Sequence, residues 1–178
     1  MAEVSTSRRA IAGIVLAIAG ALLLVDILLG FANINALDPW LTVLAWVAIA
    51  AAFLILAIAS FRNTIARIAL IVSAVGFLLL ALANAGVMLP DPLGLVANIA
   101  AAAGMLVAAI VLYAGKEIQN LTAIVFVVTA IVVAIIVLLS AANITVDAAL
   151  VTILSLLFGI GVLVTGILFA RVQGARGR

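Results

Sequence analysis

Six long apolar runs, separated by short polar turns, dominate this sequence. Each run has at least 20 residues, and a helix of about 20 residues at about 1.5 Å per residue crosses a hydrocarbon core of about 30 Å. The runs are uniformly apolar instead of alternating between apolar and polar residues, which argues against a membrane β-barrel. We therefore predict an all-α integral membrane protein with six transmembrane helices. The predicted spans are residues 10–31, 41–60, 68–87, 93–114, 121–142 and 148–170.

The composition leads to the same class of protein. Only 8% of the 178 residues are charged and 70% are hydrophobic, whereas a soluble domain keeps roughly a quarter of its residues charged. Only short segments lie between the apolar runs, so we expect a single transmembrane domain over residues 1–178 and no attached soluble domain.

The first apolar run has a second interpretation, as an export signal, because Ser7-Arg8-Arg9 precedes it. However, the run is too long for a signal peptide, and no convincing cleavage site with small residues follows it. We therefore expect a short polar tail over residues 1–7, followed by a spanning helix.

The charged residues alternate between the two sides of the predicted membrane domain. All eight basic residues fall on one side, whereas three aspartates, Asp38, Asp91 and Asp147, fall in the turns on the other. By the positive-inside rule the basic side is cytoplasmic, so both termini are predicted to lie in the cytoplasm. The basic residues are Arg8, Arg9, Arg62, Arg67, Lys116, Arg171, Arg176 and Arg178.

An internal repeat is visible in the turns on the acidic side. Asp38-Pro39 recurs 53 positions later as Asp91-Pro92, and an Ala-Asn pair precedes each of the three turns. Helices of equal length would also give equal spacing, but the recurring pairs favour three tandem hairpins. Because each hairpin has two spans, the repeats would run parallel. The pairs are Ala32-Asn33, Ala83-Asn84 and Ala142-Asn143.

Further features accompany the three hairpins. They are the stretch Arg9-Ala10-Ile11-Ala12-Gly13, the turns Asp38-Pro39 and Asp91-Pro92, and the glycines Gly20, Gly76, Gly104 and Gly159. Together these features resemble the HdeD-like family of small bacterial inner-membrane proteins, which are built from hairpin repeats. The resemblance implies a multi-pass protein of the bacterial cytoplasmic membrane, a link to acid stress, and no catalytic signature. The third turn lacks the proline.

The residue types that are missing exclude several kinds of chemistry. The chain has no Cys and no His, which excludes disulfides, thiolate nucleophiles, Cys/His metal sites and an imidazole base. No phosphate loop, nucleophile elbow or paired carboxylates occur. We therefore predict no enzymatic activity, no catalytic or metal-binding residue and no cofactor. Lys116-Glu117 is interpreted as a solvated turn, because adjacent residues do not face each other on a helix.

Asp26 is the main candidate for a functional group. It lies inside the first span, about five residues before its outer end, where a carboxylate is costly and often marks an ion or proton path. With no cation on that side, it must be hydrated, protonated or hydrogen-bonded. The alternative is that the helix ends early and Asp26 faces interfacial water.

Four asparagines near the outer ends of the spans form a candidate polar site together with Asp26. They could line a cup that admits a small ligand, or they could cap helices and satisfy free backbone groups. The asparagines are Asn33, Asn84, Asn98 and Asn143.

Small residues recur at a spacing of four, which allows helices to approach closely, either within one chain or between subunits. Trp40, Phe61 and Tyr113 are interpreted as interfacial anchors, whereas Trp46 is expected to be packed. The small-residue pairs are Gly13 and Ala17, Ala100 and Gly104, and Ser155 and Gly159.

Two functions remain open. The first is a non-enzymatic structural or accessory protein, with a role in stress, that packs against itself as a homo-oligomer or against another membrane protein. The second is a small proton, ion or solute transporter or channel that uses Asp26 and the asparagines. Membrane lipids are expected partners because basic turns attract anionic headgroups. Nucleic acid is not an expected partner. Asp26 facing the bundle axis would support transport, whereas Asp26 facing outer water would support the first function.

Overall fold

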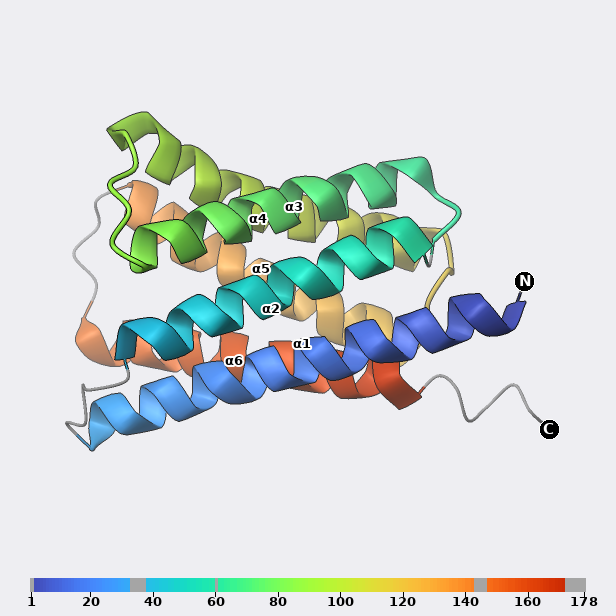
Figure 1. Cartoon of the computed structure of the whole chain (residues 1–178), viewed down its shortest axis with the longest axis horizontal. Helices are drawn as coiled ribbons and strands as arrows, with labels where there is room; N and C mark the ends of the chain where they lie inside the picture. Colours follow the sequence, from blue (N-terminus) through green and yellow to red (C-terminus); the bar gives the residue numbers. More distant parts are fainter. Residues whose placement is uncertain (1, 33–37, 60, 143–146, 172–178) are drawn as a thin grey trace.

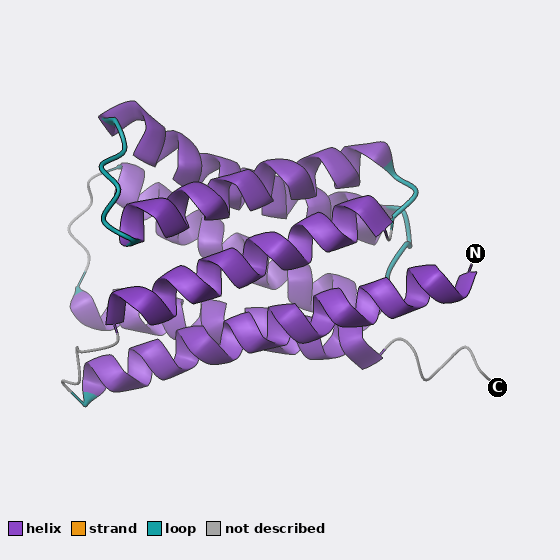
Figure 2. Cartoon of the chain, viewed as in Figure 1, coloured by secondary structure: helices purple, strands orange, loops and turns teal. Residues whose placement is uncertain are grey.

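The chain folds into six α-helices in the computed structural model, which describes residues 2–32, 38–59, 61–142 and 147–171 (Figure 2). Every helix is long and apolar enough to cross a membrane. The predicted fold class, an all-α protein with six membrane-spanning helices, is therefore confirmed. The helices are α1 (Ala2–Phe31), α2 (Asp38–Ala59), α3 (Thr64–Asn84), α4 (Asp91–Ala114), α5 (Asn120–Ala141) and α6 (Ala148–Arg171).

The ends of α1 and α3 differ from the predicted spans for local reasons. Helix α1 already begins at Ala2, so the stretch predicted as a polar tail continues the helix, since extending an existing helix is easy. Helix α3 begins four residues before the predicted span because Asn63 caps it, with its side-chain oxygen accepting hydrogen bonds from the backbone N–H groups of Ile65 and Ala66. Gly86, with a φ of 87°, follows its end.

The six helices form a closed ring in chain order (Figure 1). Helices α1, α2 and α3 make one layer, and α6, α5 and α4 lie behind them in the view of Figure 1. Within the described parts of the chain, each helix makes close backbone contacts only with its two neighbours around the ring. The contact between α1 and α6, the first and last helices, closes the ring and is the most extensive of all.

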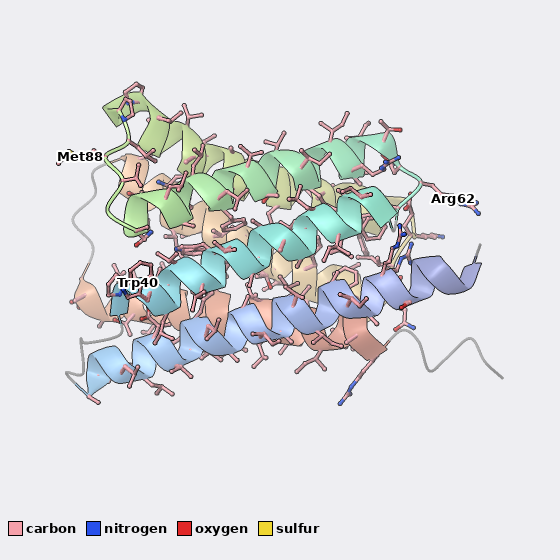
Figure 3. The ribbon with its side chains drawn as sticks, viewed as in Figure 1. Trp40, Arg62 and Met88 are labelled. Atoms are coloured by element: carbon pink, nitrogen blue, oxygen red, sulfur yellow. The ribbon has the colours of Figure 1, made fainter. Side chains whose placement is uncertain are left out.

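The two ends of the bundle differ in charge. The start of α1 and the end of α6 lie at one end, and Arg62 projects from that end, whereas Trp40 and Met88 lie at the other (Figure 3). We call the first the basic end, because the turns and helix ends there carry Arg8, Arg9, Arg62, Arg67, Lys116 and Arg171. We call the other the opposite end. Large apolar side chains are exposed on all six helices, as a surface in contact with lipid requires.

Glycines make the close contact between α1 and α6 possible. A Cβ atom added at Gly13 would meet the backbone of Ala170, Phe169 and Gly166, and one added at Gly166 would meet the backbone of Ala17. In lipid, such close backbone approach supplies the van der Waals contact that holds helices together. The two backbones therefore touch only because these positions lack a side chain.

We predict that Gly13→Ala lowers the free energy of unfolding by about 1–3 kcal/mol, because the added methyl group forces α1 away from α6. The matched control is Gly30→Ala in the same helix, where an added Cβ has nothing within 4 Å. There alanine should be neutral or stabilise by up to about 1 kcal/mol. Thermal unfolding of both variants in detergent measures the difference, and equal behaviour would contradict the packing described here.

Candidate axial binding cavity

A continuous chain of aromatic rings fills the axis of the bundle. Every phenylalanine except Phe31 belongs to it, and consecutive ring centroids lie 5.3–6.5 Å apart. Stacked and edge-on contacts at such distances stabilise by about 0.5–1.5 kcal/mol beyond area burial. We call this set the aromatic column. From the basic end it runs through Phe61, Phe169, Phe126, Phe53, Phe77, Trp46 and Phe158.

Polar contacts cover the aromatic column at the basic end. The guanidinium carbon of Arg9 lies 5.0 Å from the ring centroid of Phe61, which suits a cation–π contact. Phe61 is buried, at 7% exposure, so its prediction as an interfacial anchor is wrong. The chain turns Phe61 inwards, where it packs against Phe169. Trp40 and Tyr113 are exposed at 62% and 51%.

Glu117 joins the two turns at the basic end. Its carboxylate accepts hydrogen bonds from the backbone N–H groups of Arg62, at 3.0 Å, and Asn63, at 2.9 Å. The interpretation of Lys116-Glu117 as a merely solvated turn is therefore wrong for Glu117. Its partners are backbone groups of a turn that is distant in the sequence. The spacing of Lys116 and Glu117 relative to each other could not reveal this contact.

A cavity of about 320 Å³ lies on the axis towards the opposite end, and side chains from all six helices line it. Its polar lining comes from Asp26, Thr42, Asn84, Asn98 and Ser155. Its apolar lining comes from Leu23, Ile27, Trp46, Phe77, Leu80, Ala101, Val133, Ile136, Val137 and Phe158. Trp46, Phe77 and Phe158 also end the aromatic column, which therefore forms the floor and part of the wall.

Asp26 faces this axial cavity from α1. The hydroxyl group of Thr42 on α2 donates a hydrogen bond to its Oδ2 atom at 2.7 Å. Helix α1 continues to Phe31, so the alternative in which the helix ends early at Asp26 is wrong. The apolar residues that follow Asp26 extend the helix, and the carboxylate is half-buried among neighbouring helices.

The structure brings Asn84 and Asn98 to the same cavity, while Asn33 and Asn143 lie outside the described residues. Asn84 is the last residue of α3, and its Nδ2 atom donates to the backbone oxygen of Leu80 at 2.8 Å. Asn98 lies within α4 and donates likewise to Gly94 at 3.0 Å. Because a backbone carbonyl can only accept, these bonds fix each amide with its nitrogen towards the helix and its oxygen available as an acceptor.

Four of the six predicted packing residues, Gly13, Ala17, Gly104 and Gly159, lie between helices of the same chain. An added Cβ at Gly104 would meet backbone atoms of Ala69 and Ser73 on α3, and one at Gly159 would meet Leu24 on α1. Ala17 borders Gly166 on α6, and Ala100 is half-buried on α4. Ser155 instead lines the cavity.

Sequence reasoning missed Thr42 and the aromatic column, and it assigned Ser155 to helix packing and not to the cavity. The ring positions carried a signal, because Phe53 follows Trp46 by seven residues and Phe169 follows Phe158 by eleven, so each pair shares a helix face. Thr42 and Ser155 carried none, since single hydroxyl residues occur on any face of a membrane helix.

Comparisons with protein-family models, with curated proteins and with solved structures find no match to this chain. The geometry of the cavity is therefore the basis for assigning a function.

We predict that Thr42→Val lowers the free energy of unfolding by about 1–3 kcal/mol, because the Asp26 carboxyl group loses the donor that α2 supplies. The control is Thr152→Val on α6, where the hydroxyl group bonds within its own helix, to the Ala148 oxygen at 2.8 Å. Thermal unfolding in detergent measures both changes. A loss for Thr42→Val no larger than that for Thr152→Val would contradict a structural role for this contact.

The geometry also predicts which positions water-soluble reagents reach. The chain has no natural cysteine, so Ser155→Cys places a single thiol in the cavity. Thr165→Cys places one on the same helix about 15 Å nearer the basic end, at a site that is 1% exposed. Methyl methanethiosulfonate should modify the first thiol, and the second more than about tenfold more slowly. Equal rates, measured by mass spectrometry, would contradict an axis closed by the aromatic column.

Proposed function

We propose that this protein binds a small solute in the axial cavity and carries it across the membrane as a small transporter. The observation that supports this proposal best is the position of Asp26, which lines a cavity on the axis of a six-helix ring. Ionisable residues within a membrane domain that face the bundle interior mark substrate, ion or proton pathways. An acid required only for stability would be better placed in water at a helix end.

The position of the cavity agrees with a binding site that is accessible from one side of the membrane. It lies towards the opposite end, where Asn84, an exposed residue, belongs to its lining. The aromatic column occupies the axis between the cavity and the basic end. A site that is accessible from one side and closed on the other is the arrangement that alternating access uses.

We infer that the basic end faces the cytoplasm of a bacterial cell and that the cavity opens away from it. The support is the positive-inside rule, since the sequence places every basic residue on one side. The resemblance to the HdeD-like family supports the bacterial cytoplasmic membrane as the location. Under this orientation the solute would enter the cavity from outside the cytoplasm.

We also propose that the ring arose from three copies of one hairpin. Aligning the hairpins on their Ala-Asn pairs matches Asp26 with Phe77 and Ile136. All three matched residues line the cavity, although they come from α1, α3 and α5. Equivalent positions would meet in this way around a threefold pseudo-axis.

A structural or accessory role is the second candidate. The continuous aromatic column supports it, because contacting rings occupy the axis between the cavity and the basic end. The unbroken α-helices support it too, since many transporters build their sites from interrupted helices. In this role the protein would act by packing against itself or against another membrane protein.

Flux measurements decide between the two candidates. Proteoliposomes containing the wild-type protein should take up protons, Na⁺, K⁺ or choline faster than empty vesicles, and Asp26→Asn should return the rate to background. Asp147→Asn is the matched control, because Asp147 is an exposed acid near the start of α6 that does not line the cavity. Background rates from the wild-type protein for all four probes would make transport of these solutes wrong and leave the accessory role.

A further inference from the structure

We propose that the axial cavity selects a compact organic cation, a molecule with one ammonium group and a small apolar body. This inference rests on the proposed function, because it names the class of solute that the same cavity binds. It follows from the charge, the hydrogen-bonding groups, the aromatic surface and the size of the cavity.

The charge of the cavity favours a cation. Among the residues that line the cavity, Asp26 carries the charged side chain. A second acid, Asp147, lies at the same end of the bundle. The described basic residues lie at the basic end, which is about 25 Å from Asp26, since Arg9 precedes Asp26 by 17 residues on α1. At this distance the described basic side chains contact neither Asp26 nor a solute in the cavity. An anion in the cavity would therefore be repelled by the Asp26 carboxylate, whereas a cation would be attracted to it.

The hydrogen-bonding groups in the wall also favour a donor on the solute. Asp26 supplies carboxylate oxygens, and the fixed amides of Asn84 and Asn98 turn their oxygens away from the helix carbonyls that they bind. The buried indole Nε1 of Trp46 is a donor with no partner among the described residues. The hydroxyl groups of Thr42 and Ser155 can accept as well as donate. The oxygens of Asp26, Asn84 and Asn98 thus outnumber the indole donor, and an ammonium group, which only donates, fits such a wall.

The aromatic surface distinguishes an organic cation from a metal ion. Trp46 lies stacked on Phe77, with ring centroids 5.3 Å apart, and 5.9 Å from Phe158, and all three residues line the cavity. Ring faces attract ammonium groups and also accept alkyl chains. Calcium ions need six to eight oxygen ligands, whereas among the described residues no group of three or more acidic side chains could hold a metal ion.

The size of the cavity limits the solute to a small molecule. A volume of about 320 Å³ equals the share of about ten water molecules in the liquid. This lies at the lower end of the range for small-molecule sites. Choline is a suitable probe, because its ammonium group and short chain fit this volume, and 3,3-dimethylbutan-1-ol has the same shape without the charge.

The test measures how fast reagents of different charge modify the single thiol of Ser155→Cys. We expect the trimethylammonium-ethyl methanethiosulfonate to react at least about tenfold faster than the sulfonato-ethyl reagent, after correction for their rates with a free thiol. Adding Asp26→Asn should remove this preference, whereas adding Asp147→Asn should keep it. Choline should slow the modification, and 3,3-dimethylbutan-1-ol should not.

Three outcomes separate this inference from the proposed function. Equal rates for the two charged reagents, or equal protection by choline and its neutral analogue, would overturn selection of a cation and leave a solute cavity. Failure of the neutral methyl reagent to reach Ser155→Cys would overturn the cavity itself. If Asp26→Asn also makes the thiol of Thr165→Cys reactive, the Asp26→Asn variant is misfolded. In that case the protection of Ser155→Cys by choline, compared with its neutral analogue and with Asp26 intact, decides whether the cavity selects a cation.

Discussion

The contact between α1 and α6 determines what the rest of this bundle can be. Lipid tails are as apolar as the helix surfaces, so helices in a membrane gain little by hiding apolar side chains from one another. They need close backbone contact, and Gly13 and Gly166 allow it between the two helices that are farthest apart in the sequence. With this contact the six helices close into a ring. Without it they would form an open sheet of hairpins whose inner face would meet lipid.

Closure of the ring gives Asp26 an environment that a single helix could not provide. A carboxyl group in the hydrocarbon region needs a hydrogen-bond partner or water, and the ring axis places Thr42 beside it at 2.7 Å. The same closure brings the rings of four helices into one aromatic column. The polar cavity and the apolar column therefore share one axis, and the column ends the cavity on the side of the basic end.

The sequence predicts the number, type and approximate position of the helices because run length and charge determine them directly. It also identifies Asp26 as exceptional, yet it cannot show where Asp26 faces, because that depends on ring closure by α1 and α6. Periodicity places Trp46 with Phe53, and Phe158 with Phe169, on one helix face each, but it does not show that these faces point to the axis. In uniformly apolar spans, the residues that face lipid and those that face the axis have the same character. Phe61 shows the limit, since its place at a span end predicted an anchor, whereas it is buried against Phe169.

The three hairpins place different side chains at the level of the cavity. This difference supports the proposal that the cavity selects a compact organic cation. Asp26, Phe77 and Ile136 occupy matching positions and meet at the cavity, but one is a carboxylate, one an aromatic ring and one an alkyl chain. Three carboxylates there would repel one another in a medium of low dielectric constant and would call for a multivalent or hydrated ion. One carboxylate between a ring and an alkyl wall instead matches a single positive charge attached to an apolar body. If the cavity binds a cation as proposed, the asymmetry of the three positions favours a solute with a single positive charge.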